Sequence, residues 1–372
     1  MSLATIAGLL CADFAPPRVT INLDTPPDHR WDGVAAAYNS SLWAALAGLE
    51  AMSPAYKLGL ELAPRLFSKQ PGSIPDEHWA EMTGIARVSR VPIGVLVALN
   101  TLYDLTASAN VHDKACTSVV AQGADGKPTH GRNLDYGPHA VMKNITAIVD
   151  YQSGGKTKFS SVSFLGCVNF NTVVVPGGWS LSQDERDQGQ IEMDWFDAFV
   201  RRRVVTFSQI RLLAETEPTF EGAVNAMRSA KLDAPSYFIF AGTQSGEGAV
   251  VSSGRDKVAQ VRRLQPDNGT WYVLETNYDG WVDPDHGDDR RDAAERHLAA
   301  EKAAGDISAD SLWRVLTNSH CKKSAGERPV LNSHTVFTAT MDPSVGFVKV
   351  QVHDPSPPAE CLPEVEVEDE EG

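Results

Sequence analysis

A cysteine stands at the head of a pattern that predicts a β-hairpin. Residues 115–121 read Ala-Cys-Thr-Ser-Val-Val-Ala, and such a run of small and β-branched residues is typical of a strand. The pair Asp125-Gly126 follows and favours a tight turn, after which residues 130–136 supply a second strand that returns alongside the first. The sequence therefore predicts a hairpin with the thiol of Cys116 at the start of its first strand.

The second strand of this hairpin carries a cation and a carboxylate, Arg132 and Asp135. A neighbouring positive charge favours the thiolate form of a cysteine, and a nearby proton acceptor makes that cysteine an effective nucleophile. Because residues three apart point to opposite faces of a flat strand, we expect a bend that brings both side chains inward. The pattern predicts a hydrolase that attacks an amide or an ester through Cys116, with a buried, inert cysteine as the alternative.

The stretch from Cys116 to Tyr136 resembles the nucleophile hairpin of the family of acid ceramidases and N-acylethanolamine-hydrolysing acid amidases. These enzymes are N-terminal nucleophile hydrolases of the choloylglycine-hydrolase type. Other motifs of the family are matched in the same order at Ile21-Asn22-Leu23-Asp24, Asp184-Glu185-Arg186-Asp187, Gly246-Glu247-Gly248, Trp271–Asp279 and Asp288-Asp289-Arg290-Arg291. The resemblance spans residues 18–354 and implies an α+β fold, a four-layer αββα sandwich of the N-terminal nucleophile hydrolase type preceded by a helical small-subunit segment.

The resemblance also implies that the chain cuts itself between Ala115 and Cys116. Residues 16–115 would then form a helical small (α) subunit, and residues 116–355 a catalytic large (β) subunit. The two cleavage fragments would remain together as a heterodimer. Cys116 would become an N-terminal residue whose free amine, with a pKa of about 8, takes the thiol proton and returns it to the leaving group.

Arg132 and Asp135 match active-site positions of the family. Asp135 is expected to orient the amine of Cys116. Arg132 is expected to lower the pKa of the thiol or to bind the carbonyl region of the substrate. Structural roles on the hairpin are the alternative for this pair.

Asn277, Arg290 and Glu185 match three further positions. Asn277 ends a predicted strand and is expected to donate to a developing oxyanion, although the sequence Asn-Tyr-Asp-Gly also favours a plain turn. Arg290 resembles the second active-site arginine of the family, with Arg291 or a salt bridge at a helix N-terminus as the alternative. Glu185 resembles an acid that supports self-cleavage or the arginine network, and a surface charge is its alternative.

The implied substrate is a lipid amide. It is either ceramide, cleaved to sphingosine and fatty acid, or an N-acylethanolamine, cleaved to ethanolamine and fatty acid, and the sequence does not distinguish the two. The helical segment before the nucleophile carries apolar side chains, most of which we expect in the core and some in peripheral contact with a membrane or lipid micelles. They are Trp43, Leu46, Leu49, Leu60, Leu62, Leu66 and Phe67.

Three other protein classes are alternatives to this family. An acylase of the bile-acid or penicillin V type would begin near its nucleophile, whereas 115 residues precede Cys116. A papain-like protease would need a different cysteine motif and a paired histidine. A non-catalytic lipid-binding protein on the same scaffold would have lost one of the matched residues, and Cys116, Arg132, Asp135 and Asn277 are all present. We therefore favour an enzyme that hydrolyses linear amides.

The charge and the cysteine pattern argue against a nucleic-acid partner and a metal site. The chain of 372 residues has a net charge of −15, and its last segment, residues 356–372, is interpreted as an acidic, disordered tail. No basic stripe is present to neutralise phosphates. The ten His show no HExxH pattern and the five Cys no CxxC spacing, so neither a metal nor a cofactor is expected. Two disulfides at most are compatible with one free nucleophile, and their pairing stays open.

The resemblance implies a lysosomal or secreted protein that uses the secretory pathway. Residues 1–15 are interpreted as a weak or partial signal segment, because an apolar run is present without a basic residue before it. Sequons at Asn39, Asn144 and Asn268 fit that route. No apolar run approaches the roughly 18 residues that a membrane-spanning helix needs.

Hydrophobic periodicity divides the chain into a helical zone, a β zone and a mixed zone. Apolar residues at three- and four-residue spacing predict helices within residues 31–111. Strands are predicted at 145–151, 161–164, 173–175, 236–241, 248–252, 260–264, 271–276, 335–341 and 346–352. Later helices are predicted at 192–213, 219–230, 288–303 and 308–317.

Overall fold

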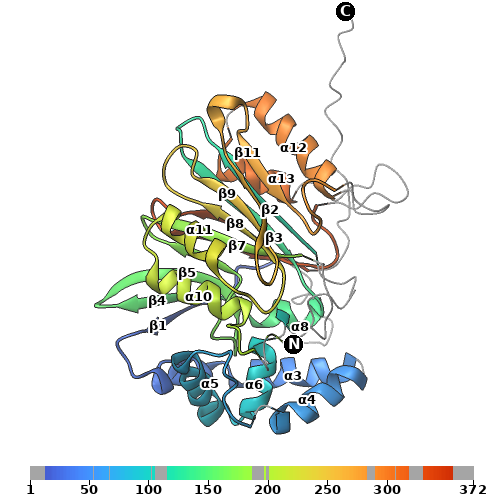
Figure 1. Cartoon of the computed structure of the whole chain (residues 1–372). Helices are drawn as coiled ribbons and strands as arrows, with labels where there is room; N and C mark the ends of the chain where they lie inside the picture. The colour runs from blue at the N-terminus through green and yellow to red at the C-terminus, as the bar shows by residue number, and fades with distance from the viewer. Residues whose placement is uncertain are drawn as a thin grey trace, which may run out of the picture.

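The fold is α+β, with two stacked β-sheets between helical layers and a cluster of helices at one end (Figure 1). The computed structural model describes residues 13–52, 54–66, 68–101, 103–104, 115–186, 197, 201–282, 290–305, 307–317 and 330–354. The predicted signal segment lies outside these residues except for positions 13–15, and the predicted acidic tail, 356–372, lies wholly outside them.

The larger sheet has eight strands in the order β1-β4-β5-β6-β7-β8-β9-β10. The strands are β1 (Arg18–Asn22), β4 (Thr146–Ser153), β5 (Lys156–Phe164), β6 (Thr172–Val175), β7 (Trp179–Glu185), β8 (Ser236–Ala241), β9 (Gly248–Ser253) and β10 (Val258–Arg263). Neighbouring strands run antiparallel, apart from β1, which pairs in parallel with β4. Seven of the eight strands therefore follow one another as a meander.

The smaller sheet has five strands in the order β11-β2-β3-β12-β13. They are β11 (Tyr272–Glu275), β2 (Ala115–Gln122), β3 (Pro128–Asp135), β12 (Thr335–Asp342) and β13 (Phe347–Val352). The predicted hairpin is confirmed, because β2 and β3 pair in register from Ala115 opposite Asp135 to Gln122 opposite Pro128. Its turn places Gly126 at a φ of 79°, a conformation that glycine adopts without a steric cost.

The two sheets pack face to face, and each is covered on its outer face by a pair of helices. Helices α10 (Thr206–Thr216) and α11 (Phe220–Ser229) lie on the eight-stranded sheet. Helices α12 (Arg290–Ala304) and α13 (Ala309–Thr317) lie on the five-stranded sheet (Figure 1, orange). Apolar side chains such as Val120 and Ile239 fill the space between the sheets. The predicted four-layer αββα sandwich is thus confirmed.

The N-terminal segment contributes a helical cluster and one strand. Its helices are α2 (Asp32–Ala37), α3 (Asn39–Met52), α4 (Pro54–Leu66), α5 (Asp76–Ser89) and α6 (Ile93–Asn100), preceded by the 3₁₀ turn η1 (Pro27–His29). Figure 1 shows α3 to α6 gathered at one end of the sandwich, next to the short helix α8 (His139–Ile145). Helices α5 and α6 start directly after Pro75 and Pro92, where a proline needs no hydrogen-bond partner for its nitrogen.

A buried ion cluster ties this helical segment to the sandwich. Glu81 of α5 accepts two hydrogen bonds of 2.6 Å from Arg211 of α10, one of 2.9 Å from Arg30 and one of 2.7 Å from Trp31. Burial raises the pKa of Glu81, but the two arginines outweigh burial and leave this pKa below its usual value. The carboxylate is therefore charged and fully paired inside the protein.

Most predicted elements are present, with differences at their ends. The helix predicted at 192–213 is interrupted, since Asp197 is helical, residues 201–205 are not, and α10 begins at Thr206, while the other residues of 192–200 lie outside the described residues. Strands β1 and β7 and helix α8 were not predicted. In β1 only Val19 and Ile21 are buried, which is a short pattern for a strand. No helix within the described ranges combines the length and apolarity needed to cross a membrane.

Candidate active site

The sulfur of Cys116 lies between the two sheets, at the beginning of β2. Cys116 is only 5% exposed, and Arg132 of β3 donates a hydrogen bond of 3.1 Å from Nη2 to its Sγ. Arg132 is itself fully buried and is held by Thr172 of β6, whose Oγ1 accepts from Nη1 at 2.7 Å. The ring of Phe337 lies 5.7 Å from the guanidinium carbon. The predicted pairing of thiol and arginine is therefore present.

The backbone of Cys116 is held on both sides by Asn277 and Arg290. The amide nitrogen of Cys116 donates to Oδ1 of Asn277 at 2.7 Å, and the carbonyl oxygen accepts from Nη1 of Arg290 at 2.7 Å. Nη2 of Arg290 donates to the same Oδ1 at 2.8 Å, and Nδ2 of Asn277 donates to the carbonyl oxygen of Glu185 at 3.0 Å. Two donors meet Oδ1 and one acceptor meets Nδ2, so the amide orientation is fixed by its partners.

Asp135 lies on the opposite face of β3 from Arg132. Its carboxylate accepts hydrogen bonds from Asn332 at 2.6 Å and Thr335 at 2.7 Å, and its Oδ2 lies 3.7 Å from Nη1 of Arg290. An irregularity is present at this point on the other side of β3, because its register with β12 shifts between Thr335 and Phe337, opposite Asp135 and Leu134. The hairpin register is unbroken, and the two residues reach the site from the two faces of one strand.

The structure thus gathers the predicted residues, but by contacts that differ from those expected. The nitrogen of Cys116 bonds to Asn277, whereas Asp135 was expected to orient it. Asn277 presents its oxygen to the nucleophile and directs its amide nitrogen to a carbonyl group, whereas donation to an oxyanion was expected. Glu185 contributes its backbone oxygen, and a role for its half-buried carboxylate stays a prediction.

Asp184, which the sequence analysis did not single out, carries the carboxylate nearest to Arg132. Its Oδ1 lies 3.7 Å from Nη2 of Arg132 and accepts a hydrogen bond of 2.8 Å from Ser118 of β2. Asp184 directly precedes Glu185 in β7, and alternation along the strand turns it toward the other sheet. The polar residues within the buried strand Trp179–Glu185 were the available signal.

Burial governs the ionisation of these groups. Burial and the charge of Asp184 raise the pKa of the Cys116 thiol, and Arg132 acts in the opposite direction. Burial likewise raises the pKa of Asp135, against the charge of Arg290. The carboxyl of Asp184 has a pKa raised to about 7 by burial, although Arg132 lowers it. In this uncut chain the nucleophile is therefore a thiol at neutral pH.

Comparison with known proteins identifies relatives of this chain. Residues 14–60 match the family model described as the beta subunit of N-acylethanolamine-hydrolyzing acid amidase. Acid ceramidase of Mus musculus is 32% identical over 358 residues, which are 91% of this chain and 86% of that protein. Acid ceramidase of Homo sapiens is 31% identical over 361 residues, which cover 91% of this chain and 87% of that protein.

The chain belongs to the acid ceramidase and N-acylethanolamine-hydrolysing acid amidase family. A solved structure, the N-acylethanolamine-hydrolyzing acid amidase ortholog of Caenorhabditis elegans, is 35% identical and covers 62% of this chain and 94% of that one, with a TM-score of 0.54. The predicted family is confirmed, and this member of it is an amide-hydrolysing enzyme. The family model describes its N-terminal segment as a beta subunit, whereas the small subunit was expected to be the α subunit.

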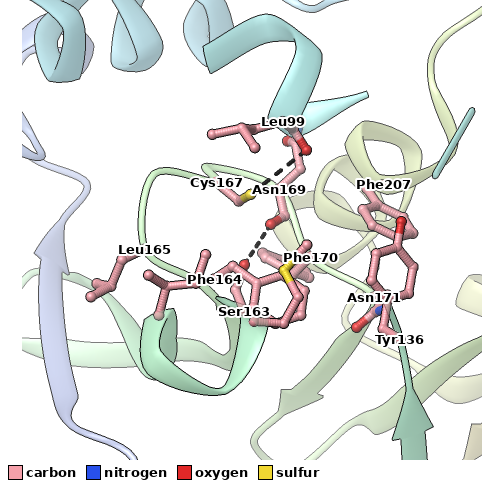
Figure 2. Close-up of a pocket in the computed structure, with 12 residues that line it drawn as sticks. Leu99, Tyr136, Ser163, Phe164, Leu165, Cys167, Asn169, Phe170, Asn171 and Phe207 are labelled. Carbon is pink, nitrogen blue, oxygen red and sulfur yellow. Dashed lines mark hydrogen bonds between the residues drawn. The ribbon is translucent and has the colours of Figure 1, made fainter. Parts of the chain in front are cut away.

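An apolar pocket lies close to Arg132 in this acid ceramidase relative. It is partly open to solvent and is lined by Leu99, Tyr136, Met142, Ile145, Ser163, Phe164, Leu165, Cys167, Asn169, Phe170, Asn171 and Phe207. Figure 2 shows Cys167 with its sulfur toward the carbonyl oxygen of Leu99, at 3.8 Å. Asn171 links the pocket to the site, because its carbonyl oxygen lies 3.4 Å from Nη1 of Arg132.

The described residues of this family member contain no group of three or more metal-ligating side chains. Of the five cysteines, Cys116 and Cys167 are free thiols in the structure. Cys11, Cys321 and Cys361 lie outside the described residues, as does any disulfide among them.

Proposed function

We propose that this protein is an autoprocessed cysteine amidase that hydrolyses lipid amides, with Cys116 as its N-terminal nucleophile. One observation carries the proposal. The nitrogen of Cys116, which would become the free amine, is held by Asn277 while Arg132 holds the sulfur of the same residue. A nucleophile whose own amine serves as its base needs both atoms to be fixed.

Self-cleavage would proceed by transfer of an acyl group within one residue. The sulfur of Cys116 attacks the carbonyl carbon of Ala115, the bond from that carbon to the nitrogen of Cys116 breaks, and a thioester forms. Water then hydrolyses the thioester, leaving a carboxylate on Ala115 and a free thiol and amine on Cys116. Asn277 supports this step, because its Oδ1 accepts from the leaving nitrogen at 2.7 Å.

Hydrolysis of the substrate would follow the same sequence, in which a thioester forms and is then hydrolysed. The free amine of Cys116, with a reference pKa of about 8, takes the thiol proton, and the thiolate attacks the substrate amide carbon. The amine leaving group departs with that proton, and water releases the fatty acid from the thioester. Arg132 favours the thiolate through its contact of 3.1 Å with the sulfur.

The apolar pocket supports a long acyl chain as the part of the substrate that binds there. Phe164, Leu165 and Phe170 line it, and it begins beside Asn171 next to Arg132. Ceramide and N-acylethanolamines share this acyl chain and differ in the amine that leaves. Enlarging the free thiol side chain in Cys167→Phe would fill the pocket, and we expect KM to rise for long-chain amides more than for short-chain ones.

We also propose that the protein contacts lipid surfaces through helix α4. Leu58 and Leu62 of α4 are 55% and 38% exposed and lie four residues apart, so they share one side of the helix. An exposed apolar pair of this kind suits a membrane or a micelle that holds the substrate. We expect Leu58→Glu to reduce co-flotation with lipid vesicles while hydrolysis of a micelle-free short-chain amide stays unchanged.

We further propose that the protein enters the secretory pathway and works in the lysosome or outside the cell. The sequons at Asn144 and Asn268 support this, because both asparagines are exposed and accessible to a glycan. Treating protein from secreting cells with a glycosidase would lower its mass if these sites are used. An unchanged mass would argue against this route.

Intact mass after incubation in acidic buffer tests the central claim. We expect two fragments, the larger one beginning at Cys116, and their formation should be abolished in Cys116→Ala. Cys167→Ala is the matched control, since Cys167 is the other described free thiol and lies off the hairpin. An uncut wild-type chain that also leaves lipid amides intact would contradict the proposal and favour a non-catalytic lipid-binding protein.

A further inference from the structure

One nitrogen of Arg132 lies between two groups that become negative when ionised. Nη2 donates to Sγ of Cys116 at 3.1 Å, and the same nitrogen lies 3.7 Å from Oδ1 of Asp184. The side chains of Arg132 and Asp184 are both 0% exposed, so water does not screen their attraction. The guanidinium carries one positive charge, and the two acidic groups share it.

We propose that Asp184 is a positioning residue whose carboxylate competes with the Cys116 sulfur for Arg132, so that acid, by protonating Asp184, frees the arginine to hold a thiolate. The inference rests on the proposed function, because it concerns how that nucleophile is activated. When Asp184 is ionised, its charge offsets that of Arg132 and favours the neutral thiol. When Asp184 is neutral, the positive charge acts on the sulfur alone.

The charge of Asp184 changes in the neutral range. The charged and titratable groups that face it are Arg132 and His130 of β3, Cys116 of β2, Tyr237 of β8, Glu275 of β11 and Arg290 of α12. Burial and Arg132 lower the pKa of His130 to about 3, so this ring stays neutral. Burial raises the pKa of Glu275 in spite of its pairing with Arg262 and Arg291, and burial raises the pKa of Asp184 to about 7.

A chain of hydroxyl groups accommodates either form of Asp184. Ser118 donates to Asp184 at 2.8 Å, Ser182 donates to Ser118 at 2.9 Å, and Nε2 of His130 lies 2.9 Å from Ser182. Hydroxyl groups rotate, and a neutral imidazole offers one donor and one acceptor. The second oxygen of Asp184, Oδ2, has no hydrogen-bond partner among the residues that the structure describes. The network can therefore accept a proton on the carboxyl without a movement of the strands.

Thiol reactivity tests the inference independently of catalysis. Wild type and Asp184→Asn, which keeps the shape of the side chain, are treated with iodoacetamide, and the adduct on Cys116 is quantified by peptide mass spectrometry. The adduct on Cys167 serves as an internal reference, because burial alone raises the pKa of that thiol. Above about pH 7 we expect Cys116 of the variant to react roughly tenfold faster for each unit by which its thiol pKa falls. Equal rates at every pH would overturn the inference.

The pH profile of self-cleavage and of lipid-amide hydrolysis supplies the second readout. Wild type should lose rate as the pH rises through about 7, whereas Asp184→Asn should keep its rate to a pH at least about one unit higher. Ser182→Ala disturbs the hydroxyl chain but leaves the charge of Asp184, and Asp184→Glu keeps a carboxyl group that titrates. In both variants the rate should still fall as the pH rises. A rate that drops by one factor at every pH in Asp184→Asn would show a merely structural role and overturn the inference.

Failure of the proposed function and failure of the role proposed for Asp184 give different results. If wild type neither cuts itself nor hydrolyses a lipid amide at any pH, the proposed function fails, and the alkylation rates still decide the role of Asp184. If Asp184→Asn does not fold, as judged by its thermal unfolding, Asp184→Ser takes its place, because its hydroxyl also removes the charge and retains a hydrogen-bonding group. A folded neutral variant with a wild-type alkylation profile would reject competition for Arg132.

Discussion

Nη1 of Arg290 and the carbonyl oxygen of Cys116 are joined by a hydrogen bond of 2.7 Å. Nη2 of the same guanidinium meets Oδ1 of Asn277 at 2.8 Å, and that oxygen accepts from the nitrogen of Cys116 at 2.7 Å. Three residues from β2, the end of β11 and the start of α12 thus form a closed ring of hydrogen bonds. Both polar groups of the cysteine backbone are fixed by it.

Replacing this arginine by lysine should disturb the ring while keeping the charge. Arg290→Lys leaves a single ammonium group where two nitrogens now bind different acceptors. We expect self-cleavage to slow by about 10²-fold, because a shift of about 1 Å in a reacting group costs that much. The measurement is the rate of fragment formation by intact mass.

Arg291→Lys is the matched control for this change. Arg291 bonds to Glu275 and to the carbonyl oxygen of Tyr278, not to Cys116. A rate in Arg290→Lys no lower than that in Arg291→Lys would contradict a positioning role for the ring.

Converting Asn277 to aspartate should impair hydrolysis more at lower pH. One carboxylate oxygen of the variant still accepts from Cys116. The other replaces Nδ2, which in the wild type donates to the carbonyl oxygen of Glu185 at 3.0 Å, so two oxygens would face each other. After cleavage a carboxylate beside the amine of Cys116 stabilises the ammonium form and raises the pKa of the amine. Because only the neutral amine accepts the thiol proton, the rising limb of the kcat/KM profile should move to higher pH. An unmoved limb in Asn277→Asp would contradict the contact between this side chain and the amine.

Breaking the buried ion cluster should destabilise the whole protein. Glu81→Gln would remove the one fully buried carboxylate that Arg211 and Arg30 share and leave them only the more exposed Glu215 and Glu77, at a cost of about 3–5 kcal/mol in the free energy of unfolding. Glu77→Gln is the matched control, because Glu77 binds the same Arg30 but is 59% exposed, and its loss should cost less than about 1 kcal/mol. Urea unfolding checks both values, and equal midpoints would contradict the assignment.

A buried pair of carboxyl groups should make the protein more stable in acid. Asp104, near the end of the N-terminal segment, and Asp233, before β8, both bind Thr206, at 3.0 Å and 3.2 Å. Burial raises the pKa of both groups, and the charge of Asp104 raises that of Asp233 further. Since their pKa is higher in the folded state than the unfolded value of about 3.9, the stability they confer is complete below that value and is lost as the pH rises through the folded pKa.

Asp233→Asn tests that pH dependence. We expect the Tm of wild type to fall as the pH rises from the unfolded pKa of about 3.9 through the raised folded values, and the Tm of the variant to fall less over the same interval. At the upper end of this interval the variant should be the more stable protein. Parallel curves for the two proteins would show that other groups cause the dependence.

The hairpin and the later strands were predictable because their signals are local. Residues 115–122 and 335–342 are rich in β-branched and small residues, and the turn at Asp125-Gly126 is set by two neighbouring positions. Strand β1 was not predictable, because Arg18–Asn22 finds its partner in β4 at residues 148–152. Its five residues carry only two buried side chains and owe their conformation to that distant pairing.

The members of the site were predictable from the resemblance, but the contacts between them were not. Cys116, Arg132, Asn277 and Arg290 meet directly, and Asp135 joins them through Arg290. Which of two adjacent acids faces Arg132 depends on the register of β7 against β8, where Asp184 pairs with Tyr237. No local pattern specifies that register, since a shift of one residue would exchange Asp184 for Glu185.

Because of strand β1, the uncut chain and a pair of separated fragments would refold in different ways. It precedes the proposed cleavage point, yet it forms an edge of the eight-stranded sheet and pairs with β4, which follows that point. An uncut chain closes this edge by an intramolecular step, whereas a denatured, cut enzyme must recover it by the meeting of two molecules. Refolding of the precursor should therefore be independent of concentration, while the yield from the mature enzyme should decline on dilution. Cleavage at the proposed point would therefore replace an intramolecular folding step by the association of two molecules.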